Sequence, residues 1–455
     1  RSSAASDVYK RQAILPPSHA TVTQNRAHPS MKRGFFTIMS AQFFSSLADN
    51  ALFVVAVELL RANGAPEWQR AALVPMFALF YVVLAPFVGA FADALPKGKV
   101  MFISNAIKVI GCLMMLYGSH PLVAYAVVGL GAAAYSPAKY GILTELLPPS
   151  QLVKANGWIE GLTIGSIILG VLAGGLLVSS QAIALLHSIP ALDAIGIHGA
   201  AQTAIFILVF IYALAAAINT RIPHTGVTMR PMPKRTIELL PDFWSCNNRL
   251  WADKLGQMSL ATTTLFWGVS GNLRYIVLAW AAAALGYSTT QASSLVGVVA
   301  IGTAAGAIIA SARVRLDQAP SVIPLGIAMG ALVILMNVIN NVWVAAPFLI
   351  LLGGLGGYLV VPMNALLQHR GHNLMGAGRS IAVQNFNEQA CILGLGAFYS
   401  LSTGLGLTAF GAITAFGLVV MIAMFFIRAL HRRNLRNHPE EVERLLHIAR
   451  SDEGH

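Results

Sequence analysis

Charged residues and cysteines are scarce in this chain of 455 residues, and each shortage excludes a class of protein. Only 11% of the residues are charged, against about 25% in ordinary soluble domains, while 56% are hydrophobic. A soluble core could not enclose so much apolar surface, so we expect an all-α membrane protein with several spans. The three cysteines, Cys112, Cys246 and Cys391, lack CxxC spacing and indicate neither a disulfide framework nor a zinc site.

Motifs for chemistry are equally scarce. The segment "DALPKGK" has Asp93 where a phosphate-binding loop requires glycine. The twelve histidines show no metal-ligand spacing, and no nucleophile–base pair is apparent. We therefore expect no enzyme, no metal and no cofactor.

Positive charge is in excess, with a formal net charge of +12. Lysine and arginine collect in alternate loops between apolar runs, which is typical of membrane topology rather than of a nucleic-acid groove. The basic loops include the connection near 220–256 and the tail beyond residue 428. The positive-inside rule therefore predicts that both termini are cytoplasmic.

The first thirty residues are interpreted separately. Residues 1–12, "RSSAASDVYKRQ", resemble the translation of a sequencing adaptor, and the polar leader that follows lacks the apolar core of a signal peptide. Met31, followed by Lys32 and Arg33, fits a cytoplasmic start.

Apolar runs long enough to cross a bilayer predict twelve transmembrane helices. They lie near 34–60, 71–92, 100–118, 121–143, 156–179, 201–219, 257–283, 290–311, 322–340, 343–366, 380–402 and 404–429. We expect a leader (1–30), a first six-helix bundle (31–220), a cytoplasmic linker (221–256), a second bundle (257–430) and a tail (431–455). The tail could form a short amphipathic helix.

An internal repeat supports this division. "GLGAAAYSP" (129–137) and "GLGGYLVVP" (354–362) match at an offset of 225 positions. Asn156 and Glu160 have counterparts in Gln384 and Glu388 at an offset of 228. Two parallel six-helix repeats around a midplane site describe a major-facilitator architecture.

Two charged residues stand out inside the apolar runs. Asp49, in "SSLADNALFV", lies halfway along the first run, where a carboxylate costs about 2.5–3.5 kcal/mol on insertion scales. The offset of 225 carries Asp49 onto Arg274 of the seventh run. We predict that the two residues face a central cavity from opposite halves; the alternative is a static ion pair that joins the halves.

Further polar residues lie at membrane depth and complete the predicted lining. They carry both signs of charge, which suits a zwitterionic or anionic amphiphile. The predicted substrate-binding set is Asp49, Asn50, Lys139, Tyr140, Asn156, Glu160, Arg274, Gln384, Asn385 and Glu388.

The loop between the second and third runs, "GAFADALPKGKV", predicts a gate. Gly89 allows close helix packing, Asp93 supplies an acid, and Lys97 and Lys99 supply the following basic cluster. This resembles the major-facilitator signature, with two extra residues after the acid. A simple positive-inside loop is the alternative.

The whole chain resembles the bacterial lysophospholipid transporters of the major facilitator superfamily, across roughly residues 35–425. The similarity is carried by "SSLADNALF", "LAPFVGAFAD", "GAAAYSPAKYGILTELLPPSQLVKANGWIEG", "TLFWGVSGNLRY" and "VVPMNALLQHRGHNLMGAGRSIAVQNFNE".

The resemblance implies that the protein flips lysophosphatidylethanolamine and lysophosphatidylglycerol from the outer to the inner leaflet of the bacterial inner membrane. A separate acyltransferase/acyl-carrier-protein synthetase would then reacylate them. It also implies that Asp49, Lys139 and Arg274 are cavity residues. Two alternatives remain open: a proton-coupled exporter of drugs or metabolites that uses Asp49 or Glu160, and a non-transporting receptor or scaffold.

Overall fold

The computed structural model describes residues 29–65, 67–186, 189–287 and 289–451, and within these ranges it contains helices and loops but no strand. The N-terminal half comprises α1 (Pro29–Ala62), α2 (Glu67–Val83), α3 (Ala85–Ala94), α4 (Lys97–Leu116), α5 (Pro121–Leu146), α6 (Pro149–Leu177) and α9 (Ala200–Asn219), with α7 (Ser180–Leu186) and α8 (Pro190–Ala194) in a loop. The linker holds η1 (Thr236–Glu238) and α10 (Leu239–Ala252). The C-terminal half comprises α11 (Gly256–Leu285), α12 (Thr289–Arg313), η2 (Leu316–Val322), α13 (Ile323–Leu335), η3 (Met336–Val338), α14 (Val342–Met375), α15 (Ala377–Gly404) and α16 (Ala409–Asn437), followed by α17 (Pro439–Arg450).

Each of the twelve predicted membrane runs coincides with a helix or a short series of helices. Within the described ranges, nine of these helical segments are long and apolar enough to span a membrane, and the bent pair α2–α3 makes a tenth. The described residues of α11 and α15, which occupy the remaining two predicted runs, do not meet that criterion. The protein is therefore a helical, multi-pass membrane protein, and the helices are consistent with the predicted count of twelve.

A sharp bend separates α2 from α3. The two helices meet at 68°, and Pro86 lies in the first turn of α3. Proline lacks a backbone N–H and fits the first turn of a helix, where that donor has no partner within the helix. The bend directs α3 toward α15 of the other half.

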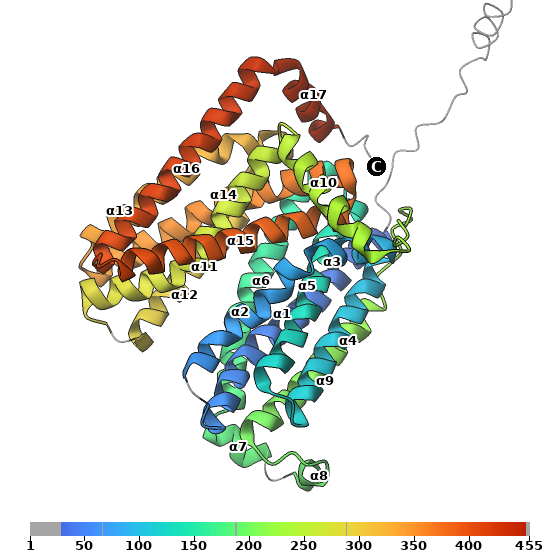
Figure 1. Cartoon of the computed structure of the whole chain (residues 1–455), viewed down its shortest axis with the longest axis vertical. Coiled ribbons are helices and arrows are strands. Elements are labelled where there is room, and N and C mark those ends of the chain that lie inside the picture. Colours follow the sequence, from blue (N-terminus) through green and yellow to red (C-terminus); the bar gives the residue numbers. More distant parts are fainter. Residues whose placement is uncertain (1–28, 66, 187–188, 288, 452–455) are drawn as a thin grey trace, which may run out of the picture.

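The two halves form bundles that lie side by side and diverge from one common end (Figure 1). The common end carries α10 and α17, and we call it the linker end (Figure 1). The helices α7 and α8 lie at the far end of the N-terminal half (Figure 1). One hydrophobic cluster lies wholly in the N-terminal half, on α1, α2, α4, α5 and α9. A larger cluster fills the C-terminal half and continues into α5 and α6.

The repeat seen in the sequence reappears in helix packing. Gly129 of α5 lies so close to Phe77 of α2 that a Cβ atom there would overlap the backbone. Its counterpart Gly354 of α14 packs against α12, where a Cβ on Gly306 would overlap the backbone of Gly354. Small residues allow such close backbone approach between membrane helices, so glycines bring α5 against α2 in one half and α14 against α12 in the other.

The predicted amphipathic helix of the tail is confirmed. Val442, Leu445 and Ala449 form the buried face of α17, which packs against η2, α16 and α6. Arg450 adds a 3.0 Å hydrogen bond from its Nε to Asp317 Oδ2 of η2.

Candidate functional site

A polar cavity of about 370 Å³ lies within the N-terminal half. Its lining comes from α1, α2, α4, α5 and α6, and its polar members are Gln42, Ser45, Ser46, Asp49, Asn50, Tyr81, Lys108, Tyr125, Tyr135, Ser136, Lys139 and Thr163. Three of the predicted binding residues, Asp49, Asn50 and Lys139, are therefore brought together here.

The carboxylate of Asp49 uses both oxygens inside its own half. Lys108 Nζ of α4 lies 2.7 Å from Oδ2, and the hydroxyl of Tyr212 on α9 donates to Oδ1 at 2.7 Å. The side chain of Arg274, its predicted counterpart, lies outside the part of the chain that the structure describes. The predicted placement of the two residues on opposite sides of a central cavity therefore stays a prediction, and the described partners of Asp49 are Lys108 and Tyr212.

Lys108 is the functional candidate that the sequence reasoning missed. Its side chain is 1% exposed and bonds Ser45 Oγ at 3.0 Å, while Ser45 in turn donates to Asn105 Oδ1 at 2.8 Å. The ammonium also lies 5.2 Å from the ring centre of Tyr135. A signal was available, because a lysine in the middle of an apolar run is as unusual as Asp49.

Lys139 supplies the second ammonium group of the cavity. Its Nζ lies 4.2 Å from the ring centre of Tyr140, within the range of a cation–π contact. Among the described residues it forms no ion pair. The cavity thus contains one lysine neutralised by an aspartate and one that is not.

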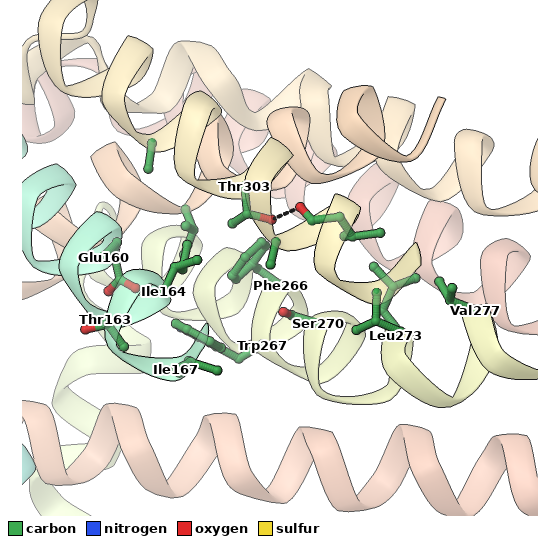
Figure 2. A pocket seen from close by; sticks show the side chains of 15 residues that line it. Glu160, Thr163, Ile164, Ile167, Phe266, Trp267, Ser270, Leu273, Val277 and Thr303 are labelled. Carbon is green, nitrogen blue, oxygen red and sulfur yellow. Dashed lines mark hydrogen bonds between the residues drawn. The ribbon is translucent and has the colours of Figure 1, made fainter. Parts of the chain in front are cut away.

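An apolar pocket of about 180 Å³ adjoins the polar cavity and shares Thr163 and Ile167 with it. Figure 2 shows Glu160, Thr163, Ile164 and Ile167 of α6 on one side, with Phe266, Trp267, Leu273 and Val277 of α11 around the pocket. Side chains of α12, including Thr303, complete the wall (Figure 2). The pocket lies between the two halves.

The remaining predicted residues lie around these spaces and mainly bond one another. Tyr140 donates to Glu160 Oε1 at 3.2 Å. In the other half, the Gln384 amide donates to Glu388 at 2.7 Å and to Asn364. Asn385 donates to Ser136 across the halves at 2.9 Å. These contacts hold polar groups at the interface, and of this group only Glu160 and Ser136 line one of the two spaces.

Asn156 forms a reciprocal amide pair with Gln368 of α14. Each Nδ2 or Nε2 donates to the other side-chain oxygen, at 2.9 and 3.0 Å, and both residues are buried. Asn156 lines neither of the two spaces described. The pair instead joins α6 to α14, so it favours the arrangement in which these helices touch.

A double-mutant series measures this pair. Asn156→Leu or Gln368→Met alone leaves one buried amide unsatisfied and is expected to destabilise the protein by about 1–3 kcal/mol. The combined variant replaces both partners with apolar groups of similar size and should be nearly neutral. Thermal unfolding in detergent measures this, with the exposed Gln151→Leu as control. If the combined variant were destabilised by the sum of the two single effects, Asn156 and Gln368 would not act as a hydrogen-bonded pair.

The predicted gate residues meet at the linker end. A Cβ on Gly89 would lie 2.7 Å from Ala382 Cβ, so only glycine allows α3 to cross α15 this closely. The carboxylate of Asp93 accepts the backbone N–H groups of Gly378 and Arg379 at 2.7 and 3.0 Å. An acid at a helix N-terminus satisfies unpaired donors and meets the positive end of the helix dipole.

Basic residues complete this closure. Lys97 is buried and lies 2.9 Å from Asp93 Oδ1 and 3.4 Å from Glu145 Oε1. Arg379 Nη1 lies 3.3 Å from Asp93 Oδ2. Lys99, also predicted for the gate, is exposed. Asp93 therefore joins the halves at the linker end through Gly378 and Arg379, and Lys97 contacts it from the same half.

Comparisons with known proteins agree with this architecture. The family model of the Major Facilitator Superfamily matches residues 38–395. The lysophospholipid transporter LplT of Yersinia pestis (strain Pestoides F) is 38% identical over 379 residues, which cover 83% of this chain and 89% of that protein. The same protein from Yersinia pseudotuberculosis serotype O:3 (strain YPIII) matches equally well.

Solved structures share the fold at low sequence identity. The human organic anion transporter MFSD10 superposes with a TM-score of 0.69 at 14% identity, covering 88% of this chain and 100% of that chain. The E. coli fucose:proton symporter FucP superposes with a TM-score of 0.65 at 15% identity, covering 88% and 99%. The chain thus belongs to the lysophospholipid transporter family within the Major Facilitator Superfamily.

Proposed function

We propose that the protein flips lysophosphatidylethanolamine and lysophosphatidylglycerol from the outer to the inner leaflet of the bacterial inner membrane. No covalent chemistry is involved. A separate acyltransferase/acyl-carrier-protein synthetase would restore the second acyl chain. The observation that carries the proposal is the pairing of a charged cavity with an adjoining apolar pocket.

This pairing suits a molecule with a charged head and one apolar chain. The cavity offers Lys139 and Lys108 to a phosphate and Asp49 to an ammonium. Charge-assisted hydrogen bonds of this kind are stronger than neutral ones and also fix the headgroup's orientation. The adjoining pocket, with Phe266, Trp267 and Val277, would receive the first part of the acyl chain.

The closed linker end supports loading from the opposite side. Asp93 of α3 joins α15 there through Gly378 and Arg379, and the basic loops favour a cytoplasmic position for that end. Because the cytoplasmic end is closed, a lipid would enter the cavity from the outer leaflet. Rocking of the halves about the central site would then deliver the lipid to the inner leaflet.

Uptake of labelled lysophosphatidylethanolamine into spheroplasts without their own transporter tests the proposal. We expect the wild-type protein to raise formation of the diacyl lipid above the empty vector. Asp49→Ala should lower it at least ~10-fold, because loss of a charge-assisted contact costs about 1.5–3 kcal/mol. The exposed Asp193→Ala is the matched control.

Two outcomes would contradict the proposal. Wild-type uptake equal to that of the vector, at matched membrane expression, would mean that the substrate is wrong. Uptake that collapses with a protonophore, together with outward flux of drugs or metabolites, would favour the proton-coupled exporter instead.

A further inference from the structure

The charges that line the polar cavity add up to one excess positive charge. They are Asp49, Lys108 and Lys139. Lys139 forms no ion pair among the described residues, and Glu160, the acid of the adjoining pocket, is bonded by Tyr140. Asp49 and Lys108, in contrast, neutralise each other at 2.7 Å. A zwitterionic headgroup and an anionic headgroup therefore face the same cation but need different responses from the ion pair.

The ion pair is built so that one contact can open while the others hold. Tyr212 fixes Asp49 through Oδ1, and Lys108 reaches only Oδ2. Lys108 is also held by Ser45 and lies near the faces of Tyr135 and Tyr212, at 5.2 and 5.5 Å from the ring centres. An ammonium could replace Lys108 at Oδ2 without releasing Asp49 from Tyr212.

Burial argues that this pair does more than stabilise the bundle. Lys108 is 1% exposed and Asp49 is 19% exposed, so the acid is the partner that faces the cavity space. Removing two charges from water offsets most of their mutual attraction, and apolar residues of similar volume often serve as well. A buried pair with its acid turned to a cavity is better explained by a ligand.

We propose that the Asp49–Lys108 pair selects headgroups by their charge, a role that rests on the proposed function. A zwitterionic headgroup opens the pair: its ammonium takes Asp49, and its phosphate takes Lys108 together with Lys139. An anionic headgroup leaves the pair closed and binds through Lys139. Both classes of lysophospholipid are thereby accepted by one cavity.

Charge-removing variants shift this selection in opposite directions. Lys108→Met leaves Asp49 free for an ammonium and repels anions, so the uptake ratio of the ethanolamine lipid to the glycerol lipid should rise at least tenfold. Asp49→Asn leaves two lysines and no acceptor for an ammonium, so the same ratio should fall at least tenfold. Asp49→Asn/Lys108→Met, with Lys139 alone, should give a ratio between those of the single variants.

The experiment measures uptake of labelled lysophosphatidylethanolamine and lysophosphatidylglycerol in the same spheroplasts. Lys154→Met and Asp193→Asn, both exposed, are the matched controls. Folding is checked by the level of membrane expression and by the melting temperature in detergent. If either single variant fails to accumulate, the double variant is used, because it removes both charges and leaves neither one buried without its partner. Because a ratio is read within each variant, uniform loss of protein does not alter it.

The results separate this inference from the proposed function. If the wild-type protein takes up both lipids and the single variants move the ratio in opposite directions, the inference holds. If wild-type uptake is intact and the ratios stay unchanged, or both move in one direction, the inference is wrong. If the wild-type protein takes up neither lipid, the proposed function fails first.

Discussion

Asp93→Ala is expected to open the linker end of the protein and raise the reactivity of buried positions there by about 100-fold or more. The carboxylate of Asp93 satisfies two backbone donors of α15 and pairs with Lys97 and Arg379. Removing one partner of a buried charge pair costs about 3–5 kcal/mol, and each 1.4 kcal/mol changes an equilibrium tenfold. The contacts with Gly378 and Arg379 join the two halves, so the cost of losing them falls on the closed state alone, whereas the Lys97 contact lies within one half.

Labelling of a single cysteine measures this opening. Thr144 is buried at the linker end and lies 3.0 Å from His372 of the other half. Thr144→Cys, in a background without the three native cysteines, would be labelled by an impermeant maleimide from the cytoplasmic face. The reagent should react far faster when Asp93→Ala is added.

Asp242→Ala is the matched control for this experiment. Asp242 also bonds Arg379, at 2.8 Å, but its side chain is 45% exposed. Exposed ion pairs contribute about 0–1 kcal/mol, so labelling should change less than about fivefold. Equal effects of the two variants would show that Asp93 does not hold the gate.

The location of this contact between the halves could be predicted from the sequence, and its spacing could not. A glycine, an acid and a basic cluster after an apolar run indicate the contact, and Gly89 and Asp93 meet α15 as such a signature predicts. The two extra residues after Asp93 gain a physical reason only in the structure. They start α4 at Lys97, four residues after Asp93, so that the lysine turns back onto the acid.

The central site was only partly predictable. The cost of a buried acid singled out Asp49, the segment "YSPAKYG" and the family resemblance singled out Lys139, and the structure places both in the polar cavity. The repeat offset pointed to Arg274 of the other half, whose side chain lies outside the described part of the chain, and it gave no sign of Lys108, which bonds Asp49 within its own half. The depth of Asp49 in the membrane follows from its place along the first apolar run. The side chains that neighbour it at that depth depend on how α1 packs against α4 and α9.

Asn156 illustrates the same limit. Its four-residue spacing from Glu160 correctly places the two on one face of α6. That face reaches α14 near Asn156 and an open pocket near Glu160, because the halves diverge away from the linker end. Which part of a polar face meets protein and which meets a cavity is set by the angle between the halves, and no sequence pattern encodes that angle directly.

Lys139→Met is expected to have the second large effect: it should lower transport and raise the stability of the lipid-free protein. Uptake of both headgroup classes should fall about 100-fold, because two charge-assisted bonds to phosphate contribute roughly 3 kcal/mol in total. The melting temperature of the lipid-free protein should rise. Lys139 is buried without an ion pair among the described residues, and burial of an unpaired charge costs several kcal/mol, against about 0.5–2 kcal/mol from its contact with Tyr140.

This combination separates a ligand-binding lysine from a structural one. A lysine that held the bundle together would lose stability and transport in parallel when replaced by methionine. A lysine kept for the phosphate is a cost to the empty protein that only the bound lipid repays, so its removal stabilises while it inactivates. Lys154→Met, at an exposed site of α6, should change neither measurement. A lower melting temperature for Lys139→Met, or uptake within threefold of the wild-type rate, would contradict the assignment of Lys139 to the phosphate.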